Sequence, residues 1–474
     1  MKKIIDYILS AMLIFFATGC SKFLDVNPKG EVFNNDMFTS AEGYEDALYG
    51  IYAELGSSDY LYKNYMLWLP EALSVNINTT DNGLQNMAVG NWYKDNAPFL
   101  RKGIWSAAYK TINHINNILN FIEKGGDDEF RYTKIYKGEA LALRALLHFN
   151  MLGMYGPPVW ADEALKAKAI PYAAKYSFDI TPFSSFDKVY ELIINDLKAA
   201  ETCLKEDETL LAAHRDNISS GGFISCRTIH MNLYAVQAML ARVYWYRNDL
   251  QNAAAYAKKV IDSGKFKMRE KSAFVQPDNG TLELDETIFG IFSTEFNSVN
   301  AKSYGLLATG GNFTLNEDWH RLYDDGSAST GSDYRLNAWF YSGALRKLVN
   351  NTFIEGSQSY NGKSILGVNV LRIPEMYYIV AESLMSSDPV EAAKYYDTVV
   401  TSRGLDALSG TANTLSEDML FRERRKEFYG EGLLWLDMKR LGKDIKVSAS
   451  ITLSGSDPVT YTVPIPLSEE ENRN

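Results

Sequence analysis

Two stretches with one shared internal spacing decide the fold of this chain. Residues 240–260 read LARVYWYRNDLQNAAAYAKKV, and residues 380–400 read VAESLMSSDPVEAAKYYDTVV. In each stretch, apolar residues recur at helical spacing on both sides of a polar turn, which is Asn248-Asp249 in the first and Asp388-Pro389 in the second. Each stretch is therefore predicted to form an antiparallel pair of helices.

Small residues occupy matching points of the two pairs. Ala241 and Ala253 are twelve residues apart, and so are Ala381 and Ala393. Small side chains let two helices approach closely, which is the device of tetratricopeptide repeats with their unit of about 34 residues. Asp397 stands where the first pair has a small apolar residue, so the second copy is degenerate. The sequence predicts a mainly α fold of tetratricopeptide-like helix pairs.

Further helices are expected outside these pairs. One begins after Ser40, a second spans residues 104–125, and a third spans residues 133–155. The third is apolar on almost every side, so it is predicted to be buried, with Arg144 and His148 as a polar pair bonded to carbonyl groups or a carboxylate. Three tryptophans at apolar helical positions are assigned to the core: Trp105, Trp245 and Trp435.

Irregular segments interrupt this helical frame. Residues 74–97 are rich in Asn, Asp and Gly and are expected to form one long loop, and residues 272–367 are expected to be a loop-rich insertion with β-like pieces such as 287–292. Near the C-terminus, apolar residues alternate from Val459 to Ile465, which predicts a brief edge strand confined by two prolines. The fold therefore includes a few short strands.

The N-terminus has the pattern of a bacterial lipoprotein signal. Lys2 and Lys3 precede an apolar run over residues 8–17, which is too short to span a bilayer, and the small residues 17–19 precede Cys20. Residues 1–19 are expected to be removed and Cys20 to be acylated, although a simple secretory signal or a buried helix with a chance cysteine stays open. Residues 20–474 are then expected to form one binding domain.

Composition excludes several classes of protein. The formal charge of −11 and the pI near 5.2 argue against a nucleic-acid partner. The five histidines lack metal-ligand spacing, and no cofactor motif or catalytic signature appears, so neither metal nor cofactor is expected. Cys203 and Cys226 leave at most one disulfide, to which we assign no structural role.

Carboxylates leave one enzymatic alternative open. A glycoside hydrolase needs only two acids brought about 5 to 9 Å apart, and the chain has 59 acidic residues. The densest charged segment, residues 421–440, places Arg424, Glu427 and Glu431 at helical steps. Arginine beside glutamate favours an ionised structural pair over proton transfer. We therefore expect this segment to be structural.

Aromatic residues in the irregular segments are the candidate ligand contacts. A flat ring beside amide or carboxylate groups suits a sugar and also suits an extended peptide, while core packing is an equally open role for each ring. One cluster lies in the Asn-rich loop and the other in the insertion. The candidates are Trp92, Tyr93, Asn96, Tyr304, Trp319, His320 and Tyr323.

An ordered set of short motifs gives the chain a family resemblance. The motifs are Cys20 with Phe23-Leu24-Asp25 and Pro28, then Trp105 with Tyr109 and Asn113, Gly138-Glu139-Ala140 with Leu143-Arg144-Ala145 and Tyr155-Gly156, residues 254–264, Asp333 with Arg335, residues 424–437, and Pro464-Ile465-Pro466. Each is weak alone, but in this order the chain resembles the SusD/RagB family of outer-membrane nutrient-binding lipoproteins of Bacteroidetes.

The resemblance implies a binding protein and not an enzyme. Such proteins cap a TonB-dependent outer-membrane transporter (SusC-like) and pass it oligosaccharides, or in some members peptides, from the cell exterior. The membrane would be contacted through the lipid anchor alone. Trp92, Tyr93 and Trp319 lie in stretches that look like the ligand-binding loops of the family. A peptide-binding member, a lipoprotein glycoside hydrolase with a carboxylate pair, and a scaffold that binds only protein remain the alternatives.

Overall fold

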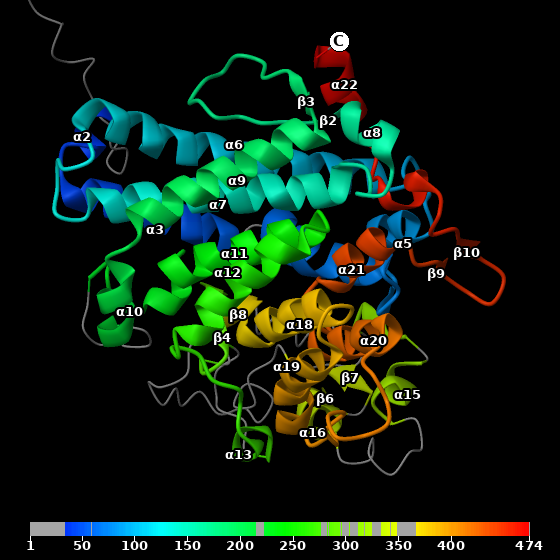
Figure 1. Cartoon of the computed structure of the whole chain (residues 1–474). Helices are drawn as coiled ribbons and strands as arrows, with labels where there is room; N and C mark the ends of the chain where they lie inside the picture. The colour runs from blue at the N-terminus through cyan, green and yellow to red at the C-terminus, as the bar shows by residue number, and fades with distance from the viewer. Residues whose placement is uncertain are drawn as a thin grey trace, which may run out of the picture.

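A row of packed helices forms the frame of the molecule (Figure 1). The computed structural model describes residues 34–57, 59–214, 222–275, 284–293, 311–316, 318–324, 333–341, 343–347 and 366–473, with the single residues 282, 295 and 303. The mainly helical, tetratricopeptide-like fold predicted from the sequence is confirmed. Cys20, Tyr304 and the segment that precedes Asn34 lie outside the described residues.

The N-terminal part of the frame contains the longest helices. Their bounds, with the short elements between them, are α2 (Asn34–Met37), α3 (Ala41–Ser57), the π-helix η1 (Asp59–Trp68), α4 (Leu69–Leu73), β1 (Ile77–Thr79), α5 (Asn82–Ala88), α6 (Ala97–Gly125), α7 (Thr133–Tyr155), α8 (Asp162–Lys166), β2 (Lys168–Pro171), β3 (Phe183–Ser185), α9 (Phe186–Cys203) and α10 (Asp207–His214). Helix α7 packs against both α6 and α9 and is buried along almost its whole length, as its apolar sequence predicted.

The two segments that predicted helix pairs form them. The first pair is α11 (Leu233–Tyr246) with α12 (Leu250–Asp262), and the second is α18 (Ile373–Leu384) with α19 (Pro389–Ser402). The turns are fixed locally, because Asp249 accepts a hydrogen bond from the Asn252 amide at 3.2 Å and Asp388 accepts one from the Glu391 amide at 3.1 Å. Helix α12 also packs against α18, so the two pairs are neighbours.

Short antiparallel strand pairs connect the insertion to this frame. The remaining elements are η2 (Arg227–Ile229), α13 (Lys271–Val275), β4 (Thr287–Phe292), β5 (Phe313–Leu315), α15 (Trp319–Tyr323), α16 (Tyr334–Trp339), β6 (Phe340–Tyr341), β7 (Ala344–Leu345), β8 (Gly367–Arg372), α20 (Glu417–Glu427), α21 (Leu434–Leu441), β9 (Ile445–Lys446), β10 (Thr452–Leu453), η4 (Pro458–Tyr461) and α22 (Leu467–Arg473). Strand β4 pairs with β8, and β5 pairs with β1. The insertion is thus joined to the frame at both places.

Two predictions about irregular segments were wrong. Residues 74–97 are not one long loop, because they contain β1 and α5, the latter capped by Asp81 and anchored by the buried Leu84 and Met87. The alternation from Val459 does not mark an edge strand either. Residues 458–461 form a 3-10 helix, and beyond it the Val463 amide donates to the Met154 carbonyl of α7 at 3.1 Å.

One large cluster of buried apolar side chains has members from Phe38 to Val463, and it includes residues of both the frame and the insertion. Trp105, Trp245 and Trp435 are at most 2% exposed, so their assignment to the core is confirmed. Over the residues that the structure describes, no helix combines the length and apolar character needed to cross a membrane.

Candidate ligand-binding surface

The β1–β5 pair brings together two segments that are far apart in the sequence. Asn78 pairs with Thr314, and both side chains are exposed. The flanking Ile77, Phe313 and Leu315 are buried, since side chains alternate between the two faces of a strand pair. The pairing therefore places a polar outer face between the Asn-rich segment and the insertion.

The loop from α5 to α6 is packed back against α5. The Asn86 amide donates to the Asp95 carboxylate at 2.9 Å, and the Asn91 backbone amide donates to the Asn86 carbonyl at 2.8 Å. A Cβ on Gly83 of α5 would lie 3.5 Å from Cβ of Asn96, so these two backbones are close neighbours. Because Asp81 caps α5 directly after β1, the loop lies beside the strand pair.

The candidates of this loop have different environments. Trp92 is 9% exposed and belongs to the main core, so its assignment as a ligand contact is wrong. Tyr93 is 61% exposed, and its ring lies under the Arg101 guanidinium at 4.8 Å. Arg101 is in turn held by the Pro464 carbonyl at 2.7 Å. Asn96 is exposed at the start of α6, so Tyr93 and Asn96 remain available to a ligand.

The candidates of the insertion divide in the same way. Trp319 is half-buried and stacks on Phe340, with ring centroids 4.6 Å apart and planes 28° apart, and the exposed His320 lies edge-on to it at 5.3 Å. Tyr323 is fully buried and its hydroxyl donates to the Lys426 carbonyl at 2.7 Å. Tyr323 is therefore a structural residue, and its assignment as a ligand contact is wrong.

We call the resulting surface the loop face. It consists of Asn78, Asp81, Tyr93, Asn96, Asn312, Thr314, Trp319 and His320. Asn78, Asn312 and Thr314 were not among the sequence candidates. Of these three, only Thr314 lies between two apolar residues, Phe313 and Leu315, in a pattern that could have indicated it. The loop face offers aromatic rings, amides and hydroxyls, which together suit a ligand with apolar faces and many hydroxyl groups.

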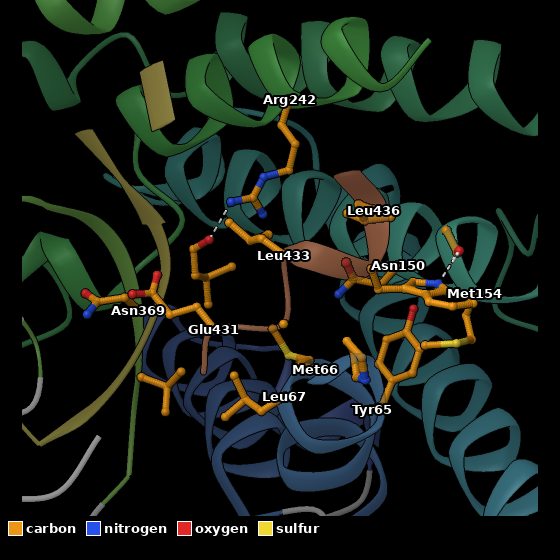
Figure 2. A pocket seen from close by; sticks show the side chains of 16 residues that line it. Tyr65, Met66, Leu67, Asn150, Met154, Arg242, Asn369, Glu431, Leu433 and Leu436 are labelled. Atoms are coloured by element: carbon orange, nitrogen blue, oxygen red, sulfur yellow. Dashed lines mark hydrogen bonds between the residues drawn. The ribbon is translucent and has the colours of Figure 1, made fainter. Parts of the chain in front are cut away.

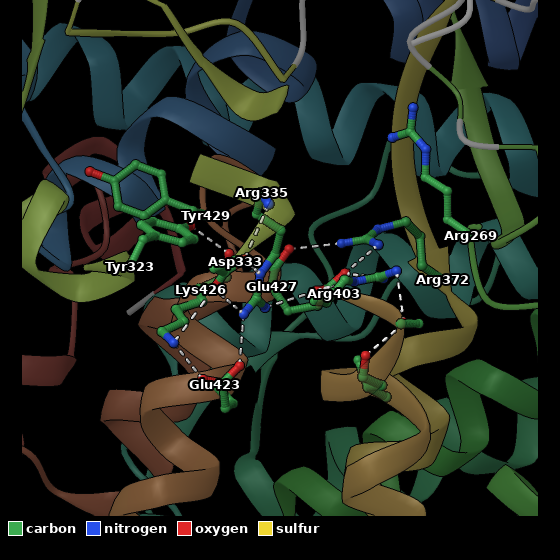
Figure 3. A network of polar contacts seen from close by, with 12 residues as sticks. Arg269, Tyr323, Asp333, Arg335, Arg372, Arg403, Glu423, Lys426, Glu427 and Tyr429 are labelled. Atoms are coloured by element: carbon green, nitrogen blue, oxygen red, sulfur yellow. Dashed lines mark hydrogen bonds and ion pairs between the residues drawn. The ribbon is translucent and has the colours of Figure 1, made fainter. Parts of the chain in front are cut away.

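A buried network of charges connects the insertion to the C-terminal helices (Figure 3). Glu427 at the end of α20 accepts hydrogen bonds from Arg335 at 3.1 Å, Arg372 at 2.8 Å, and Arg403 at 2.7 and 2.9 Å. These four side chains are buried, and the three guanidinium groups hold the pKa of Glu427 well below its usual range despite the opposing effect of burial. Outer members of the network are Asp333, Glu286, Glu423, Glu431, Lys347 and Lys426.

This network is suited to structure and not to proton transfer. A general acid must carry a proton at the working pH, whereas Glu427 is held in its ionised form. The expectation that residues 421–440 are structural is thus supported, but the expected pairing of Arg424 was wrong. Arg424 bonds Asp437 at 3.0 Å, and helix α20 ends at Glu427, so Glu431 lies in the turn beyond it.

The predicted polar pair of α7 is confirmed as a buried structural group. Arg144 binds both oxygens of Asp196 at 2.7 Å. The His148 Nδ1 lies 2.9 Å from the Arg144 carbonyl, and its Nε2 accepts from the Ala173 amide at 3.1 Å. Burial lowers the pKa of His148 to about 3, so this ring is neutral in the folded protein.

The described residues give little support for a metal site or for a disulfide. Within the described ranges, no three His, Cys, Asp or Glu side chains are grouped as metal ligands would be. Cys203 and Cys226 are free thiols and not a disulfide.

Two family models match most of the chain. A model described as "Starch-binding associating with outer membrane" matches residues 22–245, and one described as "SusD family" matches residues 292–460. A SusD-like protein of Bacteroides ovatus is 22% identical over 500 aligned residues, which cover 91% of this chain and 81% of that protein.

Solved structures share the fold over nearly its full length. A putative sugar-binding protein from Bacteroides vulgatus superposes with a TM-score of 0.72 at 20% identity, covering 91% of this chain and 96% of the other. Surface glycan-binding protein A from Bacteroides thetaiotaomicron, solved in complex with laminarihexaose, gives a TM-score of 0.66 at 17% identity, covering 92% and 98%. At these identities the likeness establishes the fold.

Proposed function

Since this chain belongs to the SusD family, we propose that it is a lipoprotein of the outer cell surface that binds an oligosaccharide and delivers it to a TonB-dependent outer-membrane transporter. It would be anchored by lipid on Cys20 and would catalyse no reaction itself. Residues 20–474 would act as one binding domain. The observation that supports the ligand assignment is the composition of the loop face, which contains the half-buried Trp319 and the exposed Tyr93 together with exposed amides and hydroxyls.

Ring stacking gives the physical basis for sugar binding at the loop face. The C–H face of a pyranose packs on an aromatic ring, while its hydroxyls bond neighbouring amides. Trp319 is supported from behind by Phe340, which fixes the orientation of its ring before any ligand arrives. A structural relative was solved with laminarihexaose, which makes β-glucan oligosaccharides the first ligands to try.

Ligand titrations with matched variants test this assignment. Purified protein would be titrated by calorimetry with laminarihexaose, with starch and xylan oligosaccharides, and with short peptides. Trp319→Ala should weaken the affinity for the best glycan about ten-fold or more, because buried tryptophans at binding sites contribute about 2 kcal/mol or more. Phe178→Ala is the control, since Phe178 is 90% exposed on the β2–β3 loop, away from the loop face.

Three outcomes would overturn parts of the proposal. Equal glycan affinity of wild type and Trp319→Ala would remove the loop face as the site. Binding of peptides alone would make the chain a peptide-binding member of the family, and hydrolysis of a glycan would make it a glycosidase. Cys20→Ala should release the protein from the membrane fraction, and co-purification of the wild type with an outer-membrane transporter would test the delivery step.

A further inference from the structure

A cavity lies inside the helical frame, apart from the loop face (Figure 2). It includes about 620 Å³ of empty space, counted together with its open mouth. Its walls come from η1, α4, α7, α11, β8, the turn at 431–433 and α21. No residue of the loop face lines it, so a ligand here would be independent of the proposed glycan contacts.

Two polar side chains of this cavity have no hydrogen-bond partner among the described residues. Tyr65 is only 3% exposed, and neither its hydroxyl nor the half-buried amide of Asn150 bonds another described group. Figure 2 shows them on one side of the cavity, with the Arg242 guanidinium entering from α11. A buried hydroxyl without a partner is unfavourable, and native proteins usually satisfy such a group with water or a ligand.

Apolar side chains form much of the rest of the wall, and the wall is closely fitted. Met66, Leu67, Met154, Leu433 and Leu436 present aliphatic surface, and Trp435 adds an aromatic ring. Gly432 has φ +75°, and a Cβ there would lie 2.1 Å from the Met66 carbonyl oxygen, so only glycine lets the turn approach η1. The π-helical form of η1 is rare in proteins and is frequent at functional sites.

The charges around the cavity are already balanced. Arg242 binds both oxygens of Glu375, at 2.8 and 2.6 Å, and the Val370 carbonyl at 2.7 Å. Glu431 also lines the cavity, and it is paired with Arg372 at 2.7 Å and Lys347 at 2.5 Å. Because the charged side chains that line the cavity are already paired, the cavity should bind a neutral ligand in preference to an ion.

From these features the geometry points to a binding site for one neutral sugar ring or a polyol of similar size. Its hydroxyls would bond the Tyr65 hydroxyl and the Asn150 amide, and its C–H face would lie on the aliphatic and aromatic walls. A purely apolar ligand would leave both polar groups unsatisfied. A polysaccharide chain would not fit, because all lining residues except Met66, Asn150 and Leu436 are buried.

Titration of the purified protein with glucose, galactose, mannose and xylose, each alone, tests this site by ligand-observed NMR. Tyr65→Phe removes only the hydroxyl, and Asn150→Leu removes only the amide at similar size. Each should weaken saturable binding of the best monosaccharide about 3- to 10-fold, as expected for the loss of one hydrogen bond. Trp319→Ala should leave this binding unchanged.

Two results would overturn the inference. One is the absence of saturable binding by all four sugars. The other is binding that is insensitive to Tyr65→Phe and Asn150→Leu, or that is lost in Trp319→Ala and therefore belongs to the loop face. The oligosaccharide affinity of the Tyr65→Phe variant shows separately whether its loop face still binds. Failure of the cavity inference can therefore be distinguished from failure of the proposed glycan site.

Discussion

Replacing Glu427 with Gln should destabilise the protein more than any exposed charge substitution. Glu427 is fully buried, and its two oxygens accept four hydrogen bonds from Arg335, Arg372 and Arg403. Glutamine keeps the shape but removes the negative charge and directs an N–H group toward a guanidinium. Removal of one partner from a buried ion pair costs about 3–5 kcal/mol, because the remaining charge is left uncompensated.

Urea unfolding followed by circular dichroism measures this effect. The matched control is Glu391→Gln, whose partner Lys394 is 61% exposed, so that pair should contribute less than about 1 kcal/mol. Glu427→Gln should lower the free energy of unfolding by about 3 kcal/mol or more. A change no larger than that of the control would refute the view that this network holds the insertion on the frame.

The same residue gives a pH dependence whose sign can be worked out. The folded-state pKa of Glu427 lies well below the ordinary value of 4.5. Its stabilisation is therefore complete above about pH 4.5, the unfolded value, and is lost as the pH falls through the folded value. The loss should be absent from the acid-unfolding profile of Glu427→Gln.

Three further perturbations have defined outcomes. The pKa of His148 is about 3 in the folded protein and 6.5 when unfolded, so the unfolded chain binds a proton there first as the pH falls. The free energy of unfolding should therefore fall by up to about 5 kcal/mol between pH 6.5 and pH 3. His148→Asn should flatten that part of a curve of stability against pH. Gly432→Ala should lower the melting temperature more than Gly343→Ala, since both have φ near +75° but only Gly432 faces a backbone carbonyl; equal shifts would disprove the clash. Asp397→Ala should lower the free energy of unfolding by about 1–3 kcal/mol and speed amide exchange at Leu408, because the Asp397 carboxylate accepts the Leu408 backbone N–H at 2.6 Å. Unchanged exchange at Leu408 would contradict that role.

The helices were predictable because their signals are local. The starts of α3, α12 and α19 are each fixed by a capping side chain that accepts the backbone N–H three residues later in the chain. The capping residues are Ser40, Asp249 and Asp388. Asp397 explains why the second helix pair departs from the repeat pattern, because its carboxylate accepts from the amides of Leu408 and Ser409 in place of packing as a small residue. That partner lies beyond the repeat, so spacing alone could not identify it.

Distant partners explain the failures. Asn76 does lie in the turn between α4 and β1, but it is buried, because its amide nitrogen donates to Glu71 at 2.8 Å and its amide oxygen accepts from Arg425 at 3.0 Å. Trp92 and Tyr93 are adjacent in the sequence, but one is in the core and the other is exposed. Nothing local distinguishes them, because the difference depends on which ring faces the frame. The inner cavity was also unpredictable, since its lining residues come from η1, α4, α7, α11, β8 and α21, which are far apart in the sequence.

Oxidative footprinting of tryptophan with and without a saturating glycan tests the central claim most directly. Trp319 is half-buried on the loop face, and Trp160 is half-buried elsewhere, where its indole N–H donates to the Lys439 carbonyl. A glycan bound at the loop face should slow oxidation of Trp319 and leave Trp160 unchanged. Equal oxidation of Trp319 in free and glycan-saturated protein would contradict the assignment of the loop face as the ligand-binding surface.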